Sequence, residues 1–166
     1  MRYTGEAHLP EKIQTWEDNW NDAVRTILFP DERLKDLLLI PDRDRENIMK
    51  FITEYFVRFP MTDEVLADHK VRVIYDDEEP DDMNIAQAVK AKLVFDIFVK
   101  SDHLHDVEQD RLKDRAVLIA DRIRHLLTRS TYVCGLRFRM GKQFGVGSRT
   151  IGYRRYRLVM NYHKTY

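Results

Sequence analysis

The sequence has one cysteine, no long apolar run and few glycines outside one short segment. Cys134 cannot form a disulfide within the chain, and it supplies too little sulfur for a structural zinc site. Its neighbours in YVCGLRF favour a small core residue over a reactive thiol. No stretch reaches the ~20 apolar residues of a membrane span, and the N-terminus lacks the apolar core of a signal peptide. We therefore expect a protein made and kept in the cytoplasm, or assembled there.

The length of 166 residues predicts one domain, or one domain with an N-terminal extension. Hydrophobic residues at 43% and aromatic residues at 11% are typical of a folded globular protein. The charged fraction of 34% exceeds the roughly 25% that is usual for such domains. The surface is therefore expected to be rich in ions.

Charge is segregated along the chain although the formal net charge is zero. Residues 1–90 contain 12 Lys and Arg against 21 Asp and Glu, a balance of −9. Residues 91–166 contain 16 against 7, a balance of +9, and the segment from Leu136 to Tyr166 has eight basic residues and no acidic one. Such asymmetry concerns partners and association, not fold.

The first part of the chain predicts helices. Apolar residues recur at three- and four-residue steps in three segments, each followed by a proline: 13–29, 31–40 and 42–59. Asp31 is expected to cap the second of these helices, and residues 61–70 are expected to add one more turn.

The period then changes to that of strands. Residues 69–79 alternate apolar and polar side chains, and in residues 86–102 one face carries Leu93, Phe95, Ile97 and Val99. A helix is expected over 107–130, with Leu112 in its apolar stripe and Asp102 or Asp106 as a cap. Two further strands, 132–140 and 153–163, are expected to form an antiparallel hairpin.

This order of elements predicts an α+β fold: a mostly antiparallel sheet of about four strands with a long helix packed on one face, plus N-terminal helices. Five of the six glycines lie between Gly135 and Gly152, which raises the question of a phosphate-binding loop. Phosphate loops lead from a strand into a helix start, whereas these glycines join one strand to another. A hairpin tip that serves as a contact arm is the preferred interpretation.

Two polar clusters suggest other chemistry. Asp102, His103, His105 and Asp106 offer the donors of a divalent metal site or of an acid and base pair, but zinc requires three or four supported ligands, and the remaining histidines are scattered. The run DDEEPDD, residues 76–82, lacks the ligand spacing and glycine of a calcium loop, so a solvated loop or an acidic contact surface is expected. No catalytic motif is present, no cofactor is expected, and the chain is not expected to be an enzyme.

The basic hairpin allows two interpretations. With tyrosines between them, Arg137, Arg139, Arg155 and Arg157 are suited to a nucleic-acid backbone. The alternative is a contact between the basic hairpin of one subunit and the acidic run of an identical neighbour. Only this head-to-tail contact uses both halves of the charge asymmetry, so self-assembly is favoured.

Three segments carry a family resemblance: KLVFDIFVKSDHLHDVEQDRLKDRAVLIADRIRHLLTRS, then VCGLRFRM, then TIGYRRYRLVMNYHKTY. In order and texture they resemble the tail-terminator and head-to-tail connector (neck) proteins of tailed bacteriophages. The resemblance covers roughly residues 70–166, an α+β core, and leaves 1–69 as an N-terminal helical region packed on the same domain.

The resemblance implies a structural virion protein. A ring, commonly a hexamer, would end the tail tube and join it to the neck, with genomic DNA passing through the lumen without sequence-specific binding and without contact to a membrane. The protein would reside in the virion tail or neck after assembly in the host cytoplasm, with the tail tube and neck proteins as partners. A neck connector or head-completion role is the alternative. The residues expected at the subunit interface are Arg137, Arg139, Lys142, Arg149, Arg154, Arg155, Arg157, Asp76, Asp77, Glu78, Glu79, Asp81 and Asp82.

Overall fold

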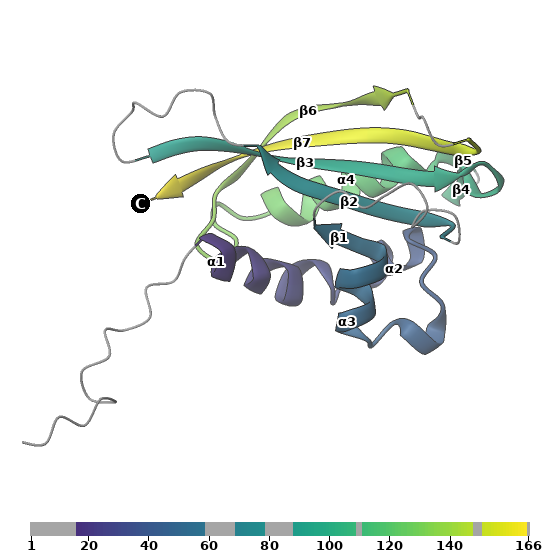
Figure 1. Ribbon diagram of the computed structural model, residues 1–166, viewed down its shortest axis with the longest axis horizontal. Coiled ribbons are helices and arrows are strands. Elements are labelled where there is room, and N and C mark those ends of the chain that lie inside the picture. Colours follow the sequence, from purple (N-terminus) through teal and green to yellow (C-terminus); the bar gives the residue numbers. More distant parts are fainter. Residues whose placement is uncertain (1–15, 59–68, 79–87, 109–110, 148–150, 166) are drawn as a thin grey trace, which may run out of the picture.

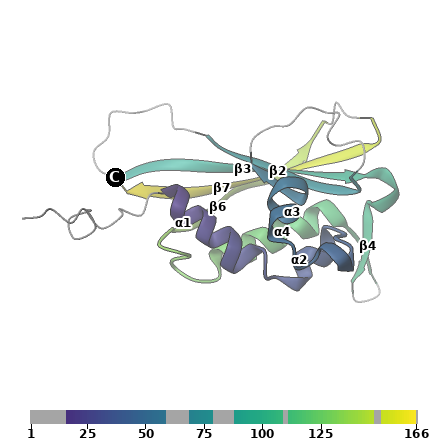
Figure 2. The same cartoon turned by 60° about the horizontal axis from the view of Figure 1, so that its bottom comes forward.

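The computed structural model describes residues 16–58, 69–78, 88–108, 111–147 and 151–165. A five-stranded sheet lies over a layer of helices (Figure 1, Figure 2). Its strands run in the order β1-β2-β3-β7-β6, and they are β1 (Phe56–Arg58), β2 (Val71–Glu78), β3 (Ala88–Lys100), β7 (Tyr153–Thr165) and β6 (Phe138–Val146). Only the β1–β2 pairing is parallel among the described strands of this sheet. The predicted α+β class, its antiparallel sheet and the β6–β7 hairpin are confirmed.

The helices cover one face of the sheet (Figure 2). They are α1 (Trp16–Ala23), which continues as the π-helical turn η1 (Val24–Leu28), α2 (Glu32–Leu37), the 3-10 turn η2 (Asp42–Asp44), α3 (Ile48–Lys50) with the π-helical turn η3 (Phe51–Tyr55), and α4 (Arg115–Thr128). None of the helices in the described part of the chain has the length and apolarity that a membrane crossing requires.

Asp31 caps α2 as predicted, since its carboxylate accepts a hydrogen bond from the Leu34 N–H at 2.8 Å. The helix ends with Leu39 in the left-handed region, at φ 55°. There the Ile40 N–H donates to the Lys35 carbonyl at 3.2 Å, which satisfies a terminal helix acceptor.

The core lies between the sheet and the helices. Trp20 of α1 is fully buried and makes ring contacts with Tyr75, Phe95 and Phe138 from three strands. Its indole N–H donates to the Tyr75 hydroxyl at 3.1 Å, so the polar atom of this large side chain is satisfied inside the core. The predicted inward face of the second strand is confirmed, because all four of its residues are fully buried: Leu93, Phe95, Ile97 and Val99.

Two predicted helices have different boundaries in the structure. The third helical segment ends at Tyr55, where the chain turns into β1 and pairs in parallel with Val73–Tyr75 of β2. The expected turn over 61–70 lies mostly outside the described residues; His69 and Lys70, at its end, are not helical.

The long helix begins at Arg115 and not near 107. Residues before it form a two-stranded hairpin, β4 (His105–Glu108) and β5 (Arg111–Asp114), after a 3-10 turn η5 (Ser101–His103). The cap is Asp114, whose carboxylate accepts from the Ala116 N–H at 2.9 Å, so the expected capping by Asp102 or Asp106 was wrong. Leu112, which was expected in the apolar stripe, is 68% exposed on this hairpin.

The glycine segment is also more regular than expected. β6 continues to Val146, with a bulge between Met140 and Lys142 that accommodates Gly141. A Cβ on Gly141 would lie 2.8 Å from the Val159 carbonyl oxygen, so only glycine fits here without a shift of the strand. Cys134 is half-buried in a two-residue turn, at φ 48°, and packs against the core from that position.

Candidate subunit interface

The face of the sheet that the helices leave uncovered forms a groove of about 590 Å³. Its lining comes from four neighbouring strands: Asp76 and Asp77 of β2, Lys92 and Val94 of β3, Arg157, Val159 and Asn161 of β7, and Met140, Gly141, Lys142 and Phe144 of β6. We call this hollow the sheet groove.

The strand register explains its composition. In one cross-strand row Asp76 faces Val94, Val94 faces Val159, and Val159 faces Lys142. Because neighbours in such a row lie on the same side of a sheet, two valines form the floor between a carboxylate and an ammonium group. The sheet groove is therefore apolar in the middle and charged at its walls.

The next row contains an internal ion cluster. Asp96 of β3 accepts hydrogen bonds from Arg155 at 2.6 Å and from Arg157 at 2.7 and 3.1 Å. Charge-assisted bonds of this kind are the stronger ones in proteins. Two of the four arginines proposed for nucleic-acid contact are thus neutralised in part by one carboxylate of their own chain.

A third arginine of β7 points to the helical side. Arg154 forms an ion pair with Asp114, the cap of α4, at 2.7 Å. Asp77 similarly pairs with Arg58 of β1 at 3.4 Å. These pairs join separate elements of one subunit, which limits how much of the predicted charge remains for a neighbour.

The remaining predicted interface residues fall into two groups. Arg137, Arg139 and Lys142 are exposed, and Lys142 lies in the sheet groove with Arg157, Asp76 and Asp77. Glu78 belongs to β2, whereas Glu79, Asp81, Asp82 and Arg149 lie outside the described residues. The structure therefore brings part of the acidic run and part of the basic hairpin to one groove of the same chain.

Other members of the sheet groove were not singled out from the sequence. Lys92 is exposed, and neither it nor Arg139 or Lys142 has a carboxylate partner among the described residues. Phe144 and Met140 of the edge strand are 42% and 44% exposed. The alternation of β3 and β7 contains the signal for Lys92 and Val159, but the pairing that makes them neighbours is not local in sequence.

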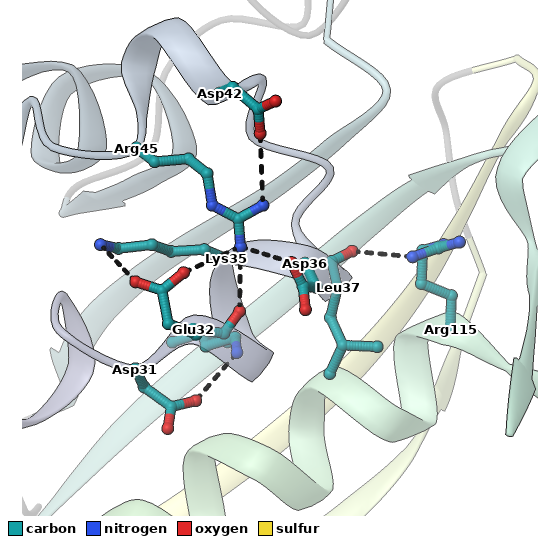
Figure 3. Close-up of polar contacts among 9 residues, drawn as sticks. Asp31, Glu32, Lys35, Asp36, Leu37, Asp42, Arg45 and Arg115 are labelled. Atoms are coloured by element: carbon teal, nitrogen blue, oxygen red, sulfur yellow. Dashed lines mark hydrogen bonds and ion pairs between the residues drawn. The ribbon is translucent and has the colours of Figure 1, made fainter.

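The helical layer carries a different charge arrangement, which Figure 3 shows. Arg45 reaches the carboxylates of Glu32 at 3.1 Å, Asp42 at 4.0 Å and Asp36. The hydrogen bond to Asp36 raises the pKa of the Arg45 guanidinium above its usual value. These carboxylates stabilise the junction of α2 and η2, so this acidic surface is compensated within the chain.

The proposed metal ligands are not gathered. Asp106 pairs with Arg33 at 3.2 Å and lies 3.9 Å from Arg115, while His105 and Asp102 are exposed. Within the part of the chain that the structure describes, no group of three His, Cys, Asp or Glu side chains is placed to hold a metal ion. Asp106 therefore anchors its hairpin to the helices through Arg33 and Arg115 and is not presented to a metal ion.

The chain was compared with known proteins and protein families. No curated protein matches the chain in sequence. The YomW family matches residues 31–162, from the cap of α2 to the buried Tyr162 of β7, and so includes the sheet groove and the β4–β5 hairpin. Because this match covers well over half of its length, the chain belongs to the YomW family, a phage-associated protein family.

Proposed function

We propose that this protein is a structural virion subunit that assembles with copies of itself into a ring at the head–tail junction, where it ends the tail tube as a tail terminator and joins it to the neck. The observation that carries the proposal is the uncovered sheet face, which exposes Phe144 on its edge strand beside the cations Lys92, Arg139 and Lys142, none of which has a carboxylate partner among the described residues.

An edge strand with exposed apolar side chains is a surface that proteins normally cover. β6 is nine residues long and pairs on one side only in the described sheet. Unpaired strand edges and contiguous exposed apolar groups both mark association surfaces. A neighbouring subunit would bury these groups and supply acceptors for the cations.

The charges favour a head-to-tail contact over a symmetric pair. In a two-fold dimer through β6, Arg139 and Lys142 would approach the same residues of the partner, and like charges repel. A contact between two different surfaces avoids this repulsion and closes into a ring when the rotation per subunit is suitable. The resemblance to tail terminators gives the expected number of about six subunits.

A role as a neck connector is the alternative to the tail-terminator role. Deletion of the gene distinguishes the two roles. Loss of a terminator should give tails of irregular length, whereas loss of a neck connector should leave tails of normal length detached from heads. Antibody labelling should place the protein at the head–tail junction of particles in both cases.

Native mass spectrometry and negative-stain microscopy test the assembly itself. We expect rings of about six copies from concentrated protein or from particles. A protein that is monomeric at high concentration and also monomeric within particles contradicts the proposal.

A nucleic-acid-binding module is less well supported, since Arg155 and Arg157 are committed to Asp96. It predicts DNA affinity that falls steeply with salt through counterion release. A gel-shift assay at low salt that shows no binding would dismiss it.

A further inference from the structure

We propose that the open edge of β6 accepts an extended, acidic segment of a different protein as a further strand of the sheet. This inference rests on the proposed function, in which the subunit contacts its copies and also joins a neighbouring protein, and it identifies the second of these contacts. An added strand would extend the sheet beyond β6 and would leave the sheet groove open to a neighbouring copy.

The outer edge of β6 has unused backbone hydrogen-bonding groups. β6 is the last strand in the order of the described sheet, and Figure 1 shows it as the outermost strand. Alternate residues of a strand direct their N–H and C=O groups to opposite edges, so about half of these groups in β6 face away from β7. Among the described residues, no backbone group outside β7 pairs with β6. Extended peptides recognise such an edge through main-chain hydrogen bonds.

The groove side of this edge presents two cations and then an aromatic ring. Arg139 faces Asn161 in the strand register and Lys142 faces Val159, and both partners line the sheet groove. Phe144 follows on the same side and is 42% exposed. Arg139 and Lys142 are exposed, and neither has a carboxylate partner among the described residues. Carboxylates at alternate positions of an added strand would lie opposite these two cations.

The helical side of the same edge is apolar. Met140 faces the buried Met160, so its side chain lies on the helical side, where Arg124 of α4 contacts its sulfur at 3.4 Å. Its 44% exposure shows that nothing covers it fully at the open edge. An apolar side chain of an added strand would cover this thioether. A nucleic-acid strand would satisfy the cations but would not complete the backbone ladder of β6.

The described strands of a second copy do not fit this edge. Two β6 strands side by side would bring Arg139 and Lys142 close to like charges. At the opposite border of the sheet, β1 is three residues long and pairs with the middle of β2, so this border is stepped and offers no straight edge as long as β6. The described carboxylates of the β4–β5 hairpin already form ion pairs within the chain. The segment therefore belongs to a different protein.

A synthetic peptide tests the inference on the whole chain. Its nine residues, the length of β6, alternate glutamate with valine. We expect saturable binding in fluorescence anisotropy and slower hydrogen exchange in residues 138–146, because the peptide backbone would pair with the open edge. A peptide of the same composition with all its glutamates at one end should bind more weakly, since its carboxylates cannot follow the strand.

Charge reversal on β6 separates a specific contact from general attraction. The double variant Arg139→Glu/Lys142→Glu should fold, because both side chains are exposed, and should bind the peptide more weakly by a factor on the order of ten, since opposite charges become like charges. The matched control Arg25→Glu/Arg43→Glu makes the same charge change on exposed side chains of the helical layer and should bind as the parent does. A peptide with lysine in place of glutamate should prefer the charge-reversed variant to the parent.

The outcomes separate this inference from the proposed function. Absence of peptide binding, binding without protection of β6, or equal affinity of the charge-reversed and control variants overturns the inference. Binding of a single-stranded DNA oligonucleotide but not of the peptide also overturns it and assigns the cations to nucleic acid. Rings that form from a chain that does not bind the peptide leave the proposed function in place, whereas a chain that is monomeric in solution and in particles removes the proposed function itself.

Discussion

Replacement of Asp31 should destabilise the fold strongly because its carboxylate has two tasks. It caps α2 by accepting a hydrogen bond from the Leu34 N–H. It also accepts two hydrogen bonds from the guanidinium of Arg122 in α4, from Nε at 2.9 Å and from Nη2 at 2.5 Å. The side chain is only 12% exposed, so water replaces these partners poorly. The pair joins the N-terminal helices to the helix that packs on the sheet.

The magnitude follows from these contacts. Loss of an N-cap costs about 1 kcal/mol, and loss of hydrogen bonds to a charged group costs about 1.5–3 kcal/mol. Because Arg122 keeps partial access to water, we take the lower part of that range and expect Asp31→Ala to lower the free energy of unfolding by about 3 kcal/mol. Asp31→Asn retains an oxygen for the cap and should lose about half as much.

Acid titration provides an independent check. Burial by itself raises the pKa of Asp31, but the hydrogen bonds from Arg122 and the Leu34 N–H outweigh it, so the pKa lies below the usual value. The pair therefore stabilises the fold above the unfolded pKa of about 4 and loses that contribution as the pH falls through the lower folded pKa.

Urea denaturation followed by circular dichroism at low protein concentration measures these differences without a contribution from assembly. The gap between the parent protein and D31N should shrink below about pH 4. An Asp31→Ala variant within about 0.5 kcal/mol of the parent at pH 7 would refute the reasoning.

Three further predictions concern the sheet, the turn before it and assembly. Asp96→Asn removes the carboxylate that Arg155 and Arg157 share and should cost about 2 kcal/mol in urea denaturation. The exposed Asp102→Asn should change stability by less than about 0.5 kcal/mol, and equal effects would contradict the role of Asp96. Cys134→Asn places a residue that tolerates positive φ in the tight turn before Gly135 and should raise the free energy of unfolding by about 0.5–1 kcal/mol, seen as a higher thermal midpoint. A lower midpoint would show that the contact between the Cys134 Sγ and the Thr26 hydroxyl, at 3.5 Å, contributes more to stability than the turn conformation does. Assembly should weaken between about 0.05 and 0.5 M NaCl, because exposed ion pairs are screened within about 10 Å at 0.1 M; sedimentation that is indifferent to salt would remove the electrostatic part of the proposal.

The sequence allowed the fold class, four of the strands and the apolar stripe of α4 to be predicted, because those features depend on local periodicity. Phe56–Arg58 continues a helical pattern in FITEYFVRF, yet it forms β1 because β2 offers it a pairing partner about seventeen residues later. Similarly, Leu112 fits the stripe of α4 when that pattern is extended backwards. The cap at Asp114 and the tether of Arg115 to the Leu104 carbonyl at 2.8 Å instead begin the helix later.

The candidate site was less accessible to prediction for a related reason. Arg155 and Arg157 looked available for a partner because their charge is visible in sequence, whereas the carboxylate that binds them is about sixty residues away on β3. The sheet groove likewise depends on the register of four strands, and no single segment contains it. Long-range pairing decides which charges are satisfied inside the chain and which remain for association.

The bulge at Gly141 has a consequence for how members of this family can differ in length. Met140 faces Met160 and Lys142 faces Val159, so the residues on both sides of Gly141 already follow one uninterrupted alternation of faces. Deletion of Gly141 would leave all the remaining β6 side chains on their present faces of the sheet and would only straighten the strand. A one-residue gap at this position in a relative's sequence would therefore signal a flatter sheet edge with the same pattern of exposed and buried residues.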